Sequence, residues 1–113
     1  MIFECLNKYE IVYIVFAQLM KKISFNELAD LCRFIKNGRL NIIKMDSKGK
    51  NAADIGLSFI AGKLSSVLEV GSQIEILSND QIFSNIVNLL NNMGFKASQV
   101  GLNSDGLMNY EKI

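Results

Sequence analysis

Histidine, tryptophan and proline are absent from this chain of 113 residues. Without histidine, the chain cannot build a Ser-His-Asp triad, a Cys-His pair or an imidazole metal site. Its two cysteines are too few for a four-ligand zinc site, and their apolar sequence contexts predict buried thiols in a reducing cytoplasm. Any metal site must therefore use carboxylates, which favour hard ions such as Mg²⁺ or Mn²⁺.

Long apolar runs are also missing. The longest one, residues 11–17, has the length of a strand and falls short of the ~18 residues that span a bilayer. The N-terminus has neither a basic segment before its apolar stretch nor a small-residue cleavage site, so we expect no secretion signal. Because 50% of the residues are apolar and 20% are charged, we expect one folded domain over residues 1–113, located in the cytoplasm and away from membranes.

Positive charge is concentrated in residues 21–50, although the net charge of the whole chain is only +1. This segment holds eight basic and three acidic residues, a balance of +5, and the rest of the chain carries −4. Such a run is usually a solvated face, but it can also form a patch that attracts phosphates. The candidate nucleic-acid contacts are Lys44, Lys48, Lys50 and Asn51.

Predicted strands alternate with predicted helices along the chain. β-branched and aromatic runs predict strands at residues 11–16, 40–45, 73–77 and 95–100. Apolar periodicity predicts helices at residues 24–36, 52–68 and 80–93, and the last residues form a Gly/Asn/Ser tail. This order favours parallel β-α-β units. We therefore predict an α/β fold, a three-layer sandwich with a mainly parallel sheet of four or five strands.

Two of the helices have informative patterns. In the first, Ser24 and Glu27 form a capping box, and Gly38 ends the helix. Its apolar residues make one stripe typical of an amphipathic helix, formed by Phe25, Leu28, Ala29, Cys32 and Ile35. The second helix is apolar or small on almost every face, so we expect it to be largely buried, with Gly56 and Gly62 allowing close backbone approach.

Two carboxylates follow the predicted parallel strands. Asp54 begins the helix after the second strand, and Asp80 directly follows the third. Because ligand sites lie beyond the carboxyl ends of parallel strands, both side chains are expected at one crevice, where they could hold a divalent ion. The alternative is local: Asn51 with Asp54 resembles a capping pair, and Asp80 is well placed to cap the next helix.

Two motifs resemble the PIN-like nuclease domains. Residues 50–54 (KNAAD), followed by an apolar helix with Gly62, are similar to the K-N-A-x-D helix start of those domains. Residues 74–83 (IEILSNDQIF) are similar to their I-I-S-x-D-x-x-F element. The resemblance covers about residues 10–100. It implies a metal-dependent ribonuclease fold in which three or four acidic residues bind one or two divalent ions.

Carried over to this chain, the resemblance makes Asp54 and Asp80 the catalytic acids and metal ligands. The other acids of the family are missing, because Ile2 takes the place of the aspartate that ends the first strand and Ser84 takes the place of a further acid. Glu4 is the remaining candidate metal ligand, although an edge-strand charge that blocks unwanted pairing explains it as well.

The N-terminus departs from the family topology. Only three residues separate Asn7 from Ile11, whereas parallel neighbouring strands need a crossover of about a dozen residues. Residues 1–6 are therefore expected to be an atypical strand that forms an antiparallel hairpin with residues 11–16, merges with them, or pairs with another chain. The first helix of the family is absent, and the apolar surface that it would cover predicts a homodimer.

Three functions are consistent with these observations. The favoured one is a degenerate PIN-like domain that binds RNA, DNA or another protein and has weak or no nuclease activity, without a cofactor. The alternative is an active ribonuclease that uses Mg²⁺ or Mn²⁺ on Asp54, Asp80 and Glu4, within one subunit or completed by a second. The third is an oligomerisation or inhibitor domain with no nucleic-acid ligand. The sequence leaves open whether the chain is an enzyme.

Overall fold

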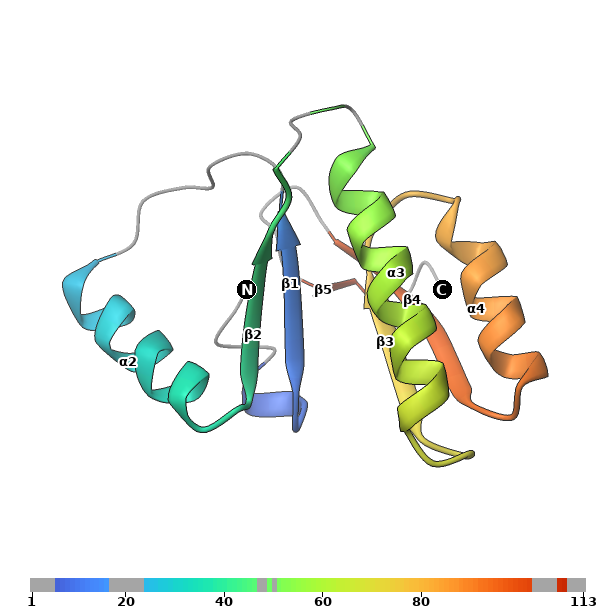
Figure 1. Cartoon of the computed structure of the whole chain (residues 1–113), viewed down its shortest axis with the longest axis horizontal. Helices are drawn as coiled ribbons and strands as arrows, with labels where there is room; N and C mark the ends of the chain where they lie inside the picture. Colours follow the sequence, from blue (N-terminus) through green and yellow to red (C-terminus); the bar gives the residue numbers. More distant parts are fainter. Residues whose placement is uncertain (1–5, 17–23, 47–48, 50, 103–107, 110–113) are drawn as a thin grey trace. The chain divides into compact units, whose positions relative to one another are not determined.

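Strands and helices alternate in the computed structural model, which describes residues 6–16, 24–46, 49, 51–102 and 108–109 (Figure 1). The elements are β1 (Val12–Phe16), α2 (Phe25–Lys36), β2 (Leu40–Lys44), α3 (Ala52–Val67), β3 (Gln73–Leu77), α4 (Phe83–Asn92), β4 (Lys96–Leu102) and β5 (Met108–Asn109). The predicted α/β class is confirmed. Among the described residues the strands form a two-stranded sheet, β1-β2, and a three-stranded sheet, β3-β4-β5, each smaller than the predicted sheet of four or five strands. The chain divides into two compact units, Ile2–Leu57 and Ser58–Ile113, and the single domain over residues 1–113 stays a prediction.

In the first unit, β1 and β2 are parallel neighbours, paired from Val12 with Leu40 to Phe16 with Lys44. The helix α2 connects them, as the predicted β-α-β unit requires. The apolar core of this unit lies between α2, the two strands and the residues before β1. Its members are the buried Leu6, Leu31 and Leu40, with the partly buried Val12, Ile14 and Phe34 packed against them.

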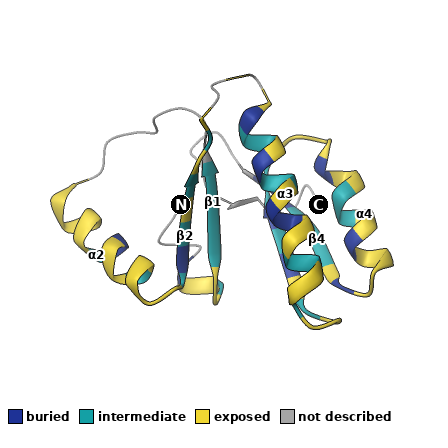
Figure 2. Ribbon diagram, viewed as in Figure 1, coloured by how far each residue is buried: buried dark blue, intermediate teal, exposed yellow. Residues whose placement is uncertain are grey.

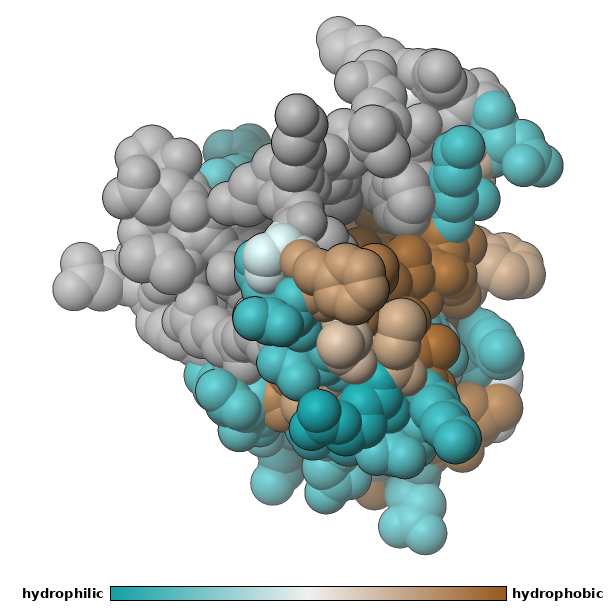
Figure 3. Space-filling model, turned by 90° about the vertical axis from the view of Figure 1, so that its left-hand side faces the viewer, coloured by the Kyte–Doolittle hydropathy of each residue, from teal (hydrophilic) through white to brown (hydrophobic). Residues whose placement is uncertain are grey.

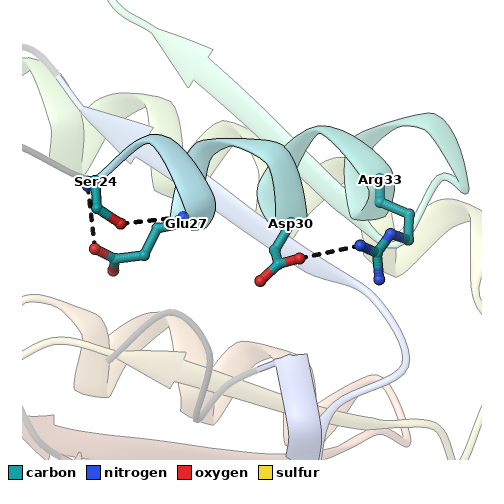
Figure 4. A network of polar contacts seen from close by, with 4 residues as sticks. All are labelled: Ser24, Glu27, Asp30 and Arg33. Atoms are coloured by element: carbon teal, nitrogen blue, oxygen red, sulfur yellow. Dashed lines mark hydrogen bonds and ion pairs between the residues drawn. The ribbon is translucent and has the colours of Figure 1, made fainter.

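The ends of α2 follow the local sequence. The Ser24 hydroxyl accepts a hydrogen bond from the Glu27 amide, and the Glu27 carboxylate accepts one from the Ser24 amide, each at 3.1 Å (Figure 4). This is the predicted capping box. The helix ends before Gly38, whose φ of 77° lies in the left-handed region that favours glycine.

The predicted apolar stripe of α2 does not face the core. Leu31 and Phe34 contact the strands, whereas Phe25 is 85% exposed, Leu28 47% and Ile35 45%. Figure 2 shows α2 exposed along most of its length. The tight exit of the helix fixes this rotation, because Arg39 N donates to Phe34 O at 3.0 Å and β2 begins at the next residue. An amphipathic pattern alone could not predict it, since Leu31 and Phe34 extend the apolar surface to one side of the stripe.

The residues before β1 differ from the prediction. Residues 6–8 form a helical turn, and Leu6 is only 2% exposed in the core of the unit. A strand that extends to residue 6 is therefore wrong. Residues 1–5, which include Ile2 and Glu4, lie outside the described residues.

In the second unit, β3 and β4 are parallel, paired from Gln73 with Lys96 to Leu77 with Val100. The strand β5 adds antiparallel to β4 through Gly101 with Asn109, where the sequence predicted only a tail. The helix α4 lies against β4 (Figure 1). The buried apolar side chains of these elements and the residue before β4 are Ile74, Ile76, Phe83, Leu90, Phe95 and Val100.

The helix α3 crosses from the first unit into the second, and it is less buried than predicted. Ile55 is 63% exposed and Phe59 72%. Close approach is confirmed at Gly56, where an added Cβ would lie 2.6 Å from the Val15 side chain, but it is wrong at Gly62, where nothing lies within 4 Å. None of the described helices has both the length and the apolar composition of a membrane span.

Candidate functional site

The carboxyl end of β3 leads into a loop that positions Asp80. Ser78 N donates to Val100 O at 3.0 Å and so extends the pairing with β4. The Ser78 hydroxyl then accepts from Asp80 N at 3.1 Å. Asp80 therefore lies at the position expected for a ligand-binding residue of a parallel sheet.

The carboxylate of Asp80 has a structural partner. Its Oδ1 atom accepts a hydrogen bond from Ile82 N at 3.0 Å, two residues ahead, and the side chain is exposed. This contact is an Asx turn, a common use of aspartate before a helix. The predicted helix start at residue 80 is wrong by three residues because the turn comes first, and α4 begins at Phe83. The prediction that Asp80 caps this helix is wrong, because the N-cap residue is Ile82 and no side chain caps it. The Asp80 carboxylate does accept a backbone amide, but in the turn before the helix.

Sequence reasoning missed Gln99, which fixes this loop from the neighbouring strand. Its side-chain Nε2 donates to the carbonyl oxygens of Ser78 and Asp80, at 2.7 Å each. Gln99 pairs with Ile76 in the parallel register. An amide side chain among the short or apolar residues that follow Lys96 in β4 was the available signal, but its partners lie about twenty positions away.

Ser84 occupies the first turn of α4, where the family resemblance implies an acid. Its hydroxyl donates to Gln81 O at 2.8 Å, within the same turn. The position is exposed and uncharged. Of the two acidic positions expected at this end of β3, Asp80 is the one that carries a carboxylate.

The second predicted acid belongs to the other unit. Asp54 lies in the first turn of α3, where a negative charge is favourable beside the helix dipole, and it is half-buried. Asp46 is an additional exposed acid just after β2. Because Asp54 and Asp80 lie in different units, an ion shared between them stays a prediction.

A divalent ion bound by protein side chains needs several oxygen donors that converge on one point. Among the described residues, no three side chains of the His, Cys, Asp or Glu type come together as a metal centre. The third predicted ligand, Glu4, lies outside the described residues. The described residues by themselves therefore do not fit a site of three carboxylates.

Two members of the basic segment have partners in the protein. Arg39 donates to the carbonyl oxygens of Leu6, of Tyr9 at 2.9 Å and of Glu10 at 3.2 Å. Arg33 forms an ion pair with Asp30 at 3.1 Å (Figure 4).

Two of the four predicted nucleic-acid contacts are among the described residues. Lys44 is exposed at the carboxyl end of β2, and Asn51 is exposed directly before α3. Lys48 and Lys50 lie outside the described residues. A nucleic-acid role for these four residues stays a prediction.

Comparison with known proteins agrees with this architecture. A family model of the PIN domain matches residues 1–100, which is most of the chain. No curated protein and no solved structure matches it. The parallel β-α-β units, with Asp80 at the carboxyl end of a strand, are consistent with the nuclease-like fold of that family. The chain therefore belongs to the PIN domain family.

Proposed function

We propose that this PIN domain is a cytoplasmic binding module with weak or no ribonuclease activity. The observation that carries the proposal is the turn after β3. There the Asp80 carboxylate accepts the Ile82 amide, and the neighbouring acidic position of the family is Ser84, whose hydroxyl bonds within its own turn. This end of the sheet thus carries fewer carboxylates than the metal-dependent hydrolysis of RNA by PIN nucleases requires.

The charge at this end of the sheet bears on whether the domain can cleave RNA. Hydrolysis of a phosphodiester by metal-activated water needs several carboxylates at one point, both to hold the ion and to offset charge in the transition state. Magnesium keeps most of its water shell and binds weakly when few carboxylates converge. Here Ser84 and, at the level of sequence, Ile2 replace two acids with neutral side chains. We expect the remaining acids to bind Mg²⁺ or Mn²⁺ poorly.

The partner that the surface favours is a protein. Large apolar side chains are exposed on α2, whereas nucleic acid is recognised first through free basic groups. In the basic segment, Arg39 is bound to backbone carbonyls and Arg33 to Asp30. Both guanidinium groups are thus held by partners in the protein, which leaves fewer of their N–H donors for phosphates. A second copy of this chain is our first candidate partner.

Purified wild-type protein is expected to leave single-stranded RNA intact in excess Mn²⁺, because the acid set is incomplete. The assay follows a labelled RNA on a denaturing gel, beside the variants Asp54→Asn and Asp80→Asn. Asp80→Asn keeps an oxygen that accepts the Ile82 amide, so its stability should change by less than about 0.5 kcal/mol.

Robust cleavage by the wild type that either variant abolishes would overturn the proposal. The chain would then be an active ribonuclease despite its neutral residues. Cleavage that persists unchanged in both variants would point to a contaminating nuclease, and the assay would be repeated after further purification.

A further inference from the structure

We infer that the exposed stripe of α2 is a docking surface for a second copy of this chain, with the two α2 helices antiparallel. The inference rests on the proposed binding function and specifies its partner and surface. From here on the stripe means its four larger side chains, Phe25, Leu28, Cys32 and Ile35, without the small Ala29 beside them. All four are exposed in the described residues. Figure 3 views the molecule from the side of α2 and shows brown apolar side chains gathered among teal ones.

The spacing of the stripe suits helix pairing. Its residues follow each other at intervals of three, four and three positions, the a/d pattern of a coiled-coil seam. The residues that hold α2 to its own unit, Leu31 and Phe34, lie beside this seam and are outside it. A partner helix can therefore dock on the stripe without displacing α2 from its core.

The stripe is also symmetric along the helix, which favours a copy of itself. Phe25 and Ile35 are each five positions from Asp30, and Leu28 and Cys32 are each two positions from it. In an antiparallel pair centred there, Phe25 meets Ile35 of the second copy and Leu28 meets Cys32. A two-fold interface requires this kind of self-complementary patch.

Charge supports the antiparallel direction. The first turn of α2 contains the acidic Glu27, and its last turn contains the basic Arg33 and Lys36. Antiparallel docking brings the acidic end of one helix beside the basic end of the other and opposes the two helix dipoles. Parallel docking would bring like charges together.

The expected dimer is weak. A helix of 12 residues is only about 18 Å long, so one pair of such helices buries less surface than the ~1,200–2,000 Å² of stable interfaces. We therefore expect a dissociation constant of about 10–100 µM. Association should be visible only when concentrated protein is compared with dilute protein.

Sedimentation velocity over about 5–500 µM protein tests this surface. The wild type should shift from monomer to dimer, and Phe25→Glu or Leu28→Glu should weaken association at least tenfold. The matched control is Asn26→Glu, which adds the same charge at an exposed position of the same turn, outside the stripe. A second control is Phe59→Glu, at an exposed aromatic residue of α3. Both controls should dimerise like the wild type.

Cross-linking provides an independent measurement. In a Cys5→Ser background, Cys32 is the remaining thiol. Across an antiparallel seam the two Cys32 residues are offset by about 6 Å along the helices, whose axes lie ~8–10 Å apart. A short bismaleimide should link this protein into a dimer, and Leu28→Glu should prevent it.

Three results would overturn the inference. These are a monomer at every concentration, equal dimerisation of Phe25→Glu and Asn26→Glu, or loss of the dimer in Phe59→Glu alone. If the wild type is monomeric and Phe25→Glu lowers the melting temperature more than Asn26→Glu does, another part of the chain covers the stripe. A monomer that leaves RNA intact would refute this surface without refuting the absence of nuclease activity.

Discussion

Replacing Arg39 by alanine is expected to lower the free energy of unfolding by about 3 kcal/mol, because hydrogen bonds from a charged donor contribute more than neutral ones. Its guanidinium donates to three backbone carbonyls in residues 6–10 and lies over the Phe34 ring, with its Cζ atom 5.2 Å from the ring centroid. It therefore joins the N-terminal turn, α2 and β2. Urea denaturation followed by circular dichroism measures the change.

The matched variant for this position is Arg39→Lys. It keeps the positive charge, but a lysine ammonium lacks the planar fork that reaches several carbonyls at once. We expect Arg39→Lys to lose most of the same stability, about 2 kcal/mol. If the lysine variant is as stable as the wild type, charge rather than hydrogen-bond geometry is what Arg39 contributes.

Substitution by alanine should change the stability of the protein in opposite directions at the two glycines of α3, Gly56 and Gly62. At Gly56 a new Cβ would lie 2.6 Å from Val15 Cγ1 and 2.7 Å from Met45 Sδ, so Gly56→Ala forces the side chains of this unit apart. We expect a loss of about 1–3 kcal/mol. At Gly62 nothing lies within 4 Å, and Gly62→Ala should stabilise the helix by ~0.5–1 kcal/mol.

Thermal unfolding of the two variants beside the wild type measures this contrast. Each of the two variants serves as the control for the other, because both substitutions add one methyl group to the same helix. Equal effects of the two substitutions would show that helix propensity, and not close approach to β1, decides the role of Gly56.

The parts of the fold that the sequence predicts correctly depend on neighbouring residues. Ser24 and Glu27 cap α2 across three positions, and Asp80 accepts an amide two positions away. Such contacts join residues two or three positions apart, so local patterns reveal them. The strands were predictable for a similar reason, since runs of β-branched residues favour extended backbone.

The parts that were missed depend on residues far apart in the chain. Arg39 was counted with a phosphate-attracting segment, but its partners are carbonyls about thirty positions earlier. Gln99 reaches the Asp80 loop from the next strand. The rotation of α2 depends on which of two adjacent apolar faces meets β2, and periodicity cannot distinguish them. In each case the missing information is tertiary packing.

The binding of Mn²⁺ tests the central claim most directly, because a PIN domain without its full acid set should not gather enough charge to hold the ion. Electron paramagnetic resonance of free Mn²⁺, titrated with the protein, measures the affinity. We predict a dissociation constant of about 1 mM or weaker, unchanged in Asp54→Asn and Asp80→Asn. Micromolar binding of Mn²⁺ that either substitution abolishes would contradict this claim and would show that the domain has a functional metal site.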